Sequence, residues 1–175
     1  MARSRRVLSD RNGPWNAPVM FVAEAPGRFG AERTGIPLCG DRSGDRFEAL
    51  LTVMSLERHL VFVTNAVLCN PLNENGHNSA PTRKELANCS GYLARTIKLV
   101  NPLIVISLGR VALQALALVC RHDLRLREAA GRIAPWNDRM LGVLYHPSPR
   151  TIVHRPWSDQ LDDARALRRA AERLL

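Results

Sequence analysis

Residues 19–27 read Val-Met-Phe-Val-Ala-Glu-Ala-Pro-Gly, and this stretch decides the fold class. The first five residues are apolar, which is typical of a buried strand. The Pro26-Gly27 pair then breaks the strand and begins a loop. The sequence therefore predicts a buried strand whose carboxyl end leads through Glu24 into a loop.

Further β-rich runs follow this strand along the chain, at residues 60–67, 103–108 and 140–145. The segments before residues 60–67 and before residues 103–108 are each long enough for a right-handed crossover helix, which joins parallel strands. We therefore predict a three-layer α/β/α sandwich with a central, mainly parallel four-stranded sheet. A chain of 175 residues, of which 46% are hydrophobic, is large enough to form one hydrophobic core but not two. We therefore expect a single domain over residues 1–175.

Helical periodicity appears between the predicted strands. Thr82 and Glu85 form a capping-box signature before a helix whose apolar face includes Cys89. Pro156 or Trp157 opens the final helix. Its expected buried stripe is Leu161, Ala164, Leu167, Ala171 and Leu174, with Arg165, Arg168, Arg169 and Arg173 largely outside the stripe.

The net charge is +9, from 25 Lys and Arg against 16 Asp and Glu. Such a surface attracts polyanions such as nucleic acid, although an Arg-rich composition alone does not establish DNA binding. The opening residues are not followed by the apolar run of a signal peptide, and no stretch is long and apolar enough for a membrane span. We expect a cytoplasmic protein with no membrane partner.

Three polar side chains are expected at one edge of the sheet. Glu24 follows the first strand, Asn65 lies near the end of the second, and His146 follows the fourth. Ligands of such folds sit beyond the carboxyl ends of the strands. Each residue also has a structural alternative, since Glu24 could cap a turn and Asn65 could tie down its own loop. His146 stands on a stiff His-Pro-Ser-Pro turn, which favours a functional role.

The chain resembles the uracil-DNA glycosylase superfamily, most closely the family-four type, over residues 18–148. The resemblance is carried, in order, by VMFVAEAPG (19–27), TGIPLCG (34–40), VTNAVLCNP (63–71), PTRKELANC (81–89), ISLGR (106–110) and YHPS (145–148). It implies a DNA-repair glycosylase that flips uracil out of DNA and hydrolyses the N-glycosidic bond to leave an abasic site.

The resemblance also implies roles for the three residues at the sheet edge. Glu24 takes the position of the glutamate near the scissile bond and the attacking water, and Asn65 matches the asparagine that reads the uracil edge. His146 matches the histidine that donates to a uracil carbonyl oxygen as negative charge develops on the base. The loop Ala25, Pro26 and Gly27 supplies backbone N–H groups to the same base.

DNA contacts are expected around the turn after the fourth strand and at the start of the helix that follows the first loop. Arg150 follows the His-Pro-Ser-Pro turn, so it is the candidate wedge that fills the gap left by the flipped nucleotide, with a plain phosphate contact as the alternative. The other candidate DNA-binding residues are Ser148, His154, Arg155 and Arg42.

Two departures from the family-four pattern affect the base pocket and the cofactor. Leu38 stands where those enzymes stack an aromatic ring on uracil, so Phe29 or Tyr145 supplies the ring or the pocket is looser. Cys69 and Cys89 match half of the ligand set of the family-four iron-sulfur cluster, but the early Cys-x-x-Cys pair is absent. Four thiolates are the usual requirement, so we expect no cluster and no other metal.

Three alternatives to a uracil-specific hydrolase remain open at the level of the sequence. A looser pocket would accept other deaminated bases such as hypoxanthine and xanthine. A non-catalytic protein could use the basic surface to bind damaged DNA. His77 could trap the abasic sugar covalently, as a histidine does in a related branch, although the KRRIH motif of that branch is missing. In each case the partner is DNA containing uracil or another deaminated base, and we expect a monomer.

Overall fold

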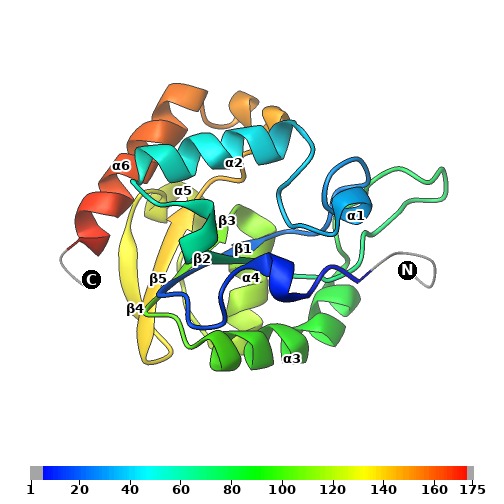
Figure 1. Cartoon of the computed structure of the whole chain (residues 1–175), viewed down its shortest axis with the longest axis horizontal. Helices are drawn as coiled ribbons and strands as arrows, with labels where there is room; N and C mark the ends of the chain where they lie inside the picture. The colour runs from blue at the N-terminus through cyan, green and yellow to red at the C-terminus, as the bar shows by residue number, and fades with distance from the viewer. Residues whose placement is uncertain (1–5, 173–175) are drawn as a thin grey trace.

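The computed structural model describes residues 6–172 and places a five-stranded sheet between two layers of helices (Figure 1). The strand order is β2-β1-β3-β5-β4, and the first four strands in that order run parallel. The strands are β1 (Val19–Ala23), β2 (Val61–Asn65), β3 (Ile104–Leu108), β4 (Ile133–Trp136) and β5 (Arg139–Leu144). The predicted three-layer α/β class is confirmed, as are the positions of the four predicted strands.

The predicted number of strands was one too few, because β4 lacks the usual signals of a strand. It is four residues long, it contains Pro135, and only Trp136 is buried. Proline is confined to sheet edges, and β4 lies at the edge, antiparallel to β5. The turn between them holds Asn137 and Asp138 at φ 48° and 58°, as a tight two-residue hairpin requires.

Two long helices cover each face of the sheet. Helices α2 (Arg42–Val53) and α6 (Trp157–Ala171) lie over one face, and α3 (Arg83–Val100) and α4 (Arg110–Val119) lie over the other (Figure 1). The residues of β1 alternate between the two layers, since Phe21 packs with α2 and Met20 packs with α3 and α4. The shorter helices are η1 (Asp10–Asn12), α1 (Ala31–Thr34), η2 (Arg58–Leu60), α5 (Leu126–Ala129) and η3 (Pro149–Val153).

Local signals at the helix ends agree with the sequence. Thr82 Oγ1 accepts from the backbone N–H of Glu85 at 3.2 Å, and Glu85 Oε2 accepts from the backbone N–H of Thr82 at 2.8 Å. This capping box fixes the start of α3. Helix α6 begins at Trp157 as predicted, and Leu161, Ala164, Leu167 and Ala171 face the core. The predicted positions of Arg173 and Leu174 lie outside the described residues.

The sheet brings the ends of four strands together at one edge. The carboxyl ends of β1, β2, β3 and β5 lie at one edge of the sheet, where the polar residues at the strand ends meet. At the outer edge of the sheet, Asn12 donates a hydrogen bond from Nδ2 to the carbonyl oxygen of Val63 in β2 at 2.7 Å.

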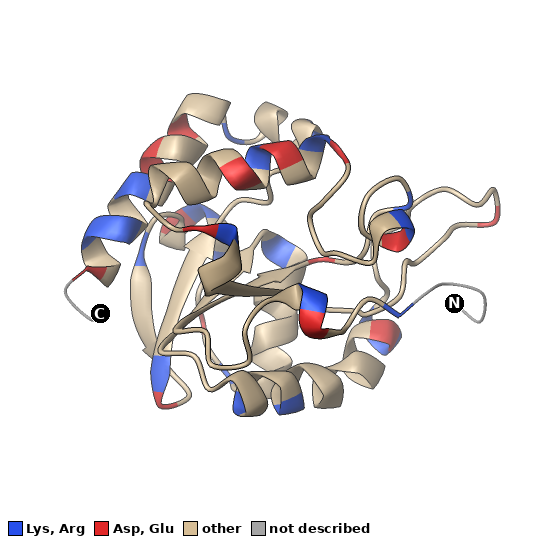
Figure 2. Ribbon diagram, in the orientation of Figure 1, with Lys and Arg blue, Asp and Glu red and all other residues tan. Residues whose placement is uncertain are grey.

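Basic residues occur on both helical layers, so the net charge alone does not locate a DNA-binding face (Figure 2). Among residues 6–172, no helix is both long and apolar enough to cross a lipid bilayer.

Candidate active site

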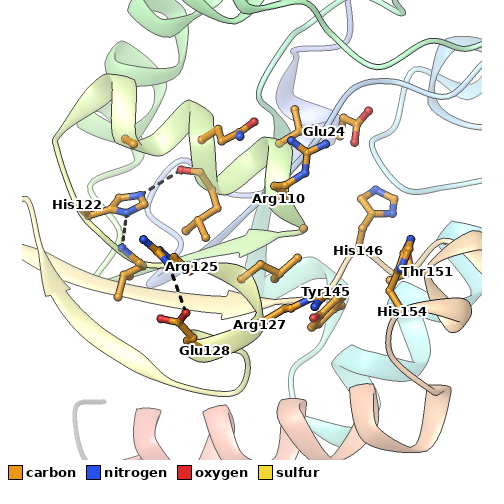
Figure 3. Close-up of a pocket in the computed structure, with 17 residues that line it drawn as sticks. Glu24, Arg110, His122, Arg125, Arg127, Glu128, Tyr145, His146, Thr151 and His154 are labelled. Atoms are coloured by element: carbon orange, nitrogen blue, oxygen red, sulfur yellow. Dashed lines mark hydrogen bonds and ion pairs between the residues drawn. The ribbon is translucent and has the colours of Figure 1, made fainter.

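Glu24 is the first residue beyond β1, and its half-buried side chain lies between two cavities. Burial raises the pKa of the carboxyl group above its ordinary value of 4.5, and the nearby Arg110 guanidinium partly opposes this effect. Arg110 comes from the first turn of α4 and points toward Glu24 (Figure 3). The Glu24 carboxyl group is thus partly shielded from water and lies near a cation. Catalytic groups often have such surroundings, which shift their pKa values.

His146 is the second residue beyond β5, and its ring lines the same two cavities. The backbone N–H of Ser148 donates to Nδ1 of His146 at 3.1 Å. Burial lowers the pKa of His146 to about 4, although Asp41 favours the protonated ring. The ring is therefore neutral at pH 7, and because Nδ1 accepts a hydrogen bond, the proton resides on Nε2. His146 thus presents an N–H donor without carrying a positive charge.

A cavity of about 670 Å³, which we call the base cavity, opens between the loop after β1, the start of α2 and the turn after β5. Its volume is within the range of small-molecule sites. It brings together ten of the residues predicted from sequence: Glu24, Ala25, Pro26, Gly27, Phe29, Leu38, Arg42, His146, Ser148 and Arg150. Phe29 stands at its mouth with 70% of its surface exposed, and Leu38 forms part of its apolar wall.

Asp41 lines the base cavity and was not predicted. It caps α2, since its Oδ1 accepts from the backbone N–H groups of Ser43 and Gly44 at 3.0 Å each. The other carboxylate oxygen packs so closely against Gly30 that a Cβ there would lie within 2.4 Å of it. Asp41 thus caps α2 and packs closely against the loop after β1. An Asp before a helix that opens with Arg-Ser-Gly is an N-cap signal that could have identified it.

Asn65 ends β2, where it pairs with Ala23 of β1, and it is 2% exposed. It is not one of the residues that line the base cavity. Its Nδ2 is buried and has no hydrogen-bond partner among the described residues. A buried donor without a partner carries a desolvation cost, and such groups in native structures often serve a ligand.

Besides Asn65, the base cavity also lacks the predicted residues His77, His154 and Arg155. His77 sits in the exposed loop 70–81, where its backbone N–H donates to Asn73 Oδ1 at 2.9 Å. His154 lines the second cavity instead. The Arg155 guanidinium is held by both carboxylate oxygens of Asp163, at 2.6 and 3.0 Å. A phosphate would have to compete with Asp163 for the Arg155 guanidinium.

The second cavity, of about 900 Å³, lies on the other side of Glu24 and His146, beneath α4 and the segment 121–128 (Figure 3). Glu24, His146 and Thr151 line both cavities. His122 lies at the far end, with Nε2 3.1 Å from the carbonyl oxygen of Leu113 and Nδ1 accepting from the backbone N–H of Leu124 at 3.3 Å. Both ring nitrogens of His122 are thus engaged within the fold.

The cysteines do not form the ligand set of an iron-sulfur cluster in the described part of the chain. Cys39, Cys69, Cys89 and Cys120 are all unpaired and partly buried, and Cys89 and Cys120 pack against the hydrophobic core. Between residues 6 and 172, no group of three or more His, Cys, Asp or Glu is placed to hold a metal ion. These residues therefore do not fit a cluster that needs four thiolates.

The fold and site together define an α/β protein with a half-buried carboxylate and a neutral histidine donor around one cavity at the carboxyl edge of its sheet. The chain belongs to the Uracil DNA glycosylase superfamily, which it matches over residues 11–170. The family resemblance predicted from the sequence is therefore confirmed.

Several relatives have names of the same kind. The chain is 38% identical over 143 residues to the Type-4 uracil-DNA glycosylase of Sulfurisphaera tokodaii, which covers 80% of this chain and 63% of that protein. It is 35% identical over 137 residues to the Type-4 uracil-DNA glycosylase of Thermotoga maritima, with 78% and 67% covered. It is also 32% identical over 162 residues to the Type-5 uracil-DNA glycosylase of Pyrobaculum aerophilum, with 79% and 66% covered. The chain thus spans about two thirds of the length of these relatives.

Proposed function

We propose that this protein is a monofunctional DNA-repair glycosylase that binds an extruded uracil in the base cavity and hydrolyses its bond to the sugar. The observation that carries the proposal is that a half-buried carboxylate, Glu24, and a neutral N–H donor, His146, line the same cavity. Superfamily membership and the names of the relatives support the same reaction. We also propose that the protein is a monomer and that it acts in the cytoplasm.

Breaking the N-glycosidic bond places opposite charges on the two products as the bond lengthens. The sugar becomes cationic and the departing uracil becomes anionic, so the enzyme must stabilise both charges at once. His146 serves the uracil by donating from Nε2 to a carbonyl oxygen. A neutral donor is suited to this task because the proton remains on the imidazole while the hydrogen bond strengthens.

Glu24 serves the sugar and the attacking water. Its carboxylate stabilises the developing cation and orients water toward the anomeric carbon. Burial strengthens this interaction, because a charge is screened less in the protein interior than in water. The nearby Arg110 limits how far burial raises the pKa of Glu24, which keeps a larger share of the carboxylate ionised at neutral pH.

Base recognition combines Asn65 with the loop after β1. The buried Nδ2 of Asn65 has no partner among the described residues, so a base carbonyl entering beside Ala23 would satisfy it. Leu38 contributes apolar contact rather than ring stacking, and Phe29 offers a ring at the mouth. The apolar wall does not itself reject a purine, which favours a base range that includes hypoxanthine and xanthine as a second candidate function.

Arg150 and Arg42 both line the base cavity and are both exposed. We assign them phosphate contacts on either side of the flipped nucleotide, with Arg150 also placed to enter the gap in the stack. The turn before Arg150 is held by Arg46, whose Nη1 donates to the carbonyl oxygen of Ser148 at 3.3 Å while its guanidinium lies over the Trp157 ring.

The test is an incision assay on oligonucleotides that carry uracil, hypoxanthine, xanthine or a thymine mispair, in single and double strands, followed by alkali to break abasic sites. We expect cleavage at uracil, with Glu24→Gln as the inactive control. Binding without incision would instead favour a non-catalytic damage-binding protein. A DNA adduct that survives denaturing electrophoresis would favour covalent trapping, and His77→Ala would then abolish it.

The proposal includes no iron-sulfur cluster. Only Cys69 and Cys89 match the family-four ligand positions, and the residues before Val19 contain no cysteine. Iron and acid-labile sulfide in purified protein should therefore be far below stoichiometric amounts. Stoichiometric iron and sulfide would overturn this part of the proposal.

A further inference from the structure

The second cavity, beyond Glu24 and His146, has an apolar wall and a basic rim. The wall comes from one side of α4, from the segment 121–128 and from Tyr145, with the apolar residues Val111, Leu113, Ala117, Leu124 and Leu126. The rim carries Arg110, Arg125 and Arg127, with His154 from the segment after η3 (Figure 3). An apolar wall beneath several cations matches a nucleotide, which has an apolar base face and an anionic phosphate.

The rim cations differ in how far the protein already neutralises them. Arg125 Nη1 lies 3.9 Å from Glu128 Oε1, and both side chains are largely exposed, so this ion pair is weak. Arg110 faces Glu24. Arg127 is exposed and makes no ion pair with any residue between 6 and 172. Arg127 is therefore the cation on this rim that is most available to a phosphate.

The two cavities share a wall formed by Glu24, His146 and Thr151. An occupant of the second cavity would thus lie one side chain away from a base in the base cavity. In a DNA strand, the group at that separation is the next nucleotide. Gln114 also lines the second cavity with an exposed amide, which can donate to and accept from a base edge.

We propose that the second cavity binds the nucleotide adjacent to the target in the same strand. Its base lies against the apolar wall beside Gln114, and its phosphate lies on the rim at Arg127. This inference rests on the proposed function, because it takes the target base to occupy the base cavity. It assigns the protein a contact with an unstacked neighbour, so a single strand, whose bases are free to leave the stack, should be the better substrate.

The test uses single-stranded oligonucleotides with one uracil and varies only the neighbouring nucleotide. One substrate has normal neighbours, and two others replace the base on the 5′ or the 3′ side by a baseless tetrahydrofuran spacer. Binding is measured by fluorescence anisotropy with Glu24→Gln, and excision is measured with the wild type under single-turnover conditions. Losing the neighbouring base on one side should weaken binding about tenfold, the scale of one base contact.

Two variants locate the contact. Ala117→Phe fills the cavity from a half-buried position of α4, so it should remove the difference between the normal and spacer substrates. Arg127→Ala should weaken binding of all the strands about fivefold by loss of a phosphate contact. Arg95→Ala is the matched control, because it removes one exposed charge from α3, on a surface that does not line either cavity. It should have a clearly smaller effect than Arg127→Ala.

The outcomes separate this inference from the proposed function. If the wild type cleaves neither the strand with normal neighbours nor its duplex, the proposed function fails. If it cleaves only the duplex, the proposed function stands and the inference about the second cavity is overturned. If the single strand is cleaved, but neither spacer changes binding, only the inference about the second cavity is overturned. A spacer effect that persists unchanged in a folded Ala117→Phe protein also overturns it, because the neighbouring base would then be bound elsewhere.

Discussion

His146 should make the stability of the folded protein depend on pH between about 4 and 6.5. Burial lowers its pKa from 6.5 to about 4 in the folded protein, whereas the unfolded chain keeps the ordinary value. Because the folded pKa is the lower one, the stabilisation is complete above pH 6.5 and is lost as the pH falls to about 4. A pKa difference of about 2.5, at about 1.36 kcal/mol for each pKa unit, corresponds to about 3 kcal/mol.

The assay compares the wild type with His146→Asn, which cannot titrate in this range. The free energy of unfolding is measured with urea at pH values from 7 to 4. Between these limits the wild type should lose about 3 kcal/mol more than the variant. Burial also lowers the pKa of His122, but that residue is present in both proteins, so its contribution cancels in the difference.

The same substitution at an exposed histidine provides the control. His77→Asn in the loop 70–81 should change stability by less than about 0.5 kcal/mol at every pH. A difference between the wild type and His146→Asn that stays constant from pH 7 to pH 4 would refute the reasoning. It would mean that burial does not lower the pKa of His146 in the folded protein, and the argument that the fold keeps this donor uncharged would fail.

Three substitutions test other parts of the site. Glu24→Gln should slow single-turnover excision of uracil by about 100-fold or more and raise the melting temperature at pH 7, since burial disfavours the charged carboxyl that it replaces; full activity would remove Glu24 from the mechanism. Leu38→Phe adds a ring to the wall of the base cavity, so hypoxanthine excision relative to uracil excision should fall in a competition assay; an unchanged ratio would show that Leu38 does not set the base range. Gly109→Ala places a Cβ 3.0 Å from that of His146 at a φ of 88°, which should lower stability by about 1–3 kcal/mol in thermal melts and slow excision; wild-type values for both would contradict the described packing.

The core strands were predictable because each is an apolar run bounded by residues that break strands. The first predicted strand has the observed bounds of β1, and the other three predicted strands lie within two residues of β2, β3 and β5. Strand β4 could not be recognised in this way, because it is short, half-exposed and contains Pro135. Its usable signal was the Asn137-Asp138 pair, which is typical of a tight hairpin turn.

The site was predictable where it depends on topology and less so where it depends on packing across the sheet edge. Glu24 and His146 follow parallel strands, so the carboxyl-edge rule places them together. Asp41 matters because its carboxylate packs against Gly30 and favours protonation of His146, and both effects arise only when α2 docks. The competing ion pair between Arg155 and Asp163 likewise depends on how α6 returns against the turn after β5.

The two outer edges of the sheet affect how the protein behaves at high concentration. An open edge with free N–H and C=O groups invites a strand from another molecule. On β2 the side chain of Asn12 already donates a hydrogen bond to the carbonyl oxygen of Val63. On β4, Pro135 has no backbone N–H group to donate to another strand. Both borders are therefore poor templates for further strands, which should protect the protein from edge-to-edge aggregation when it is concentrated.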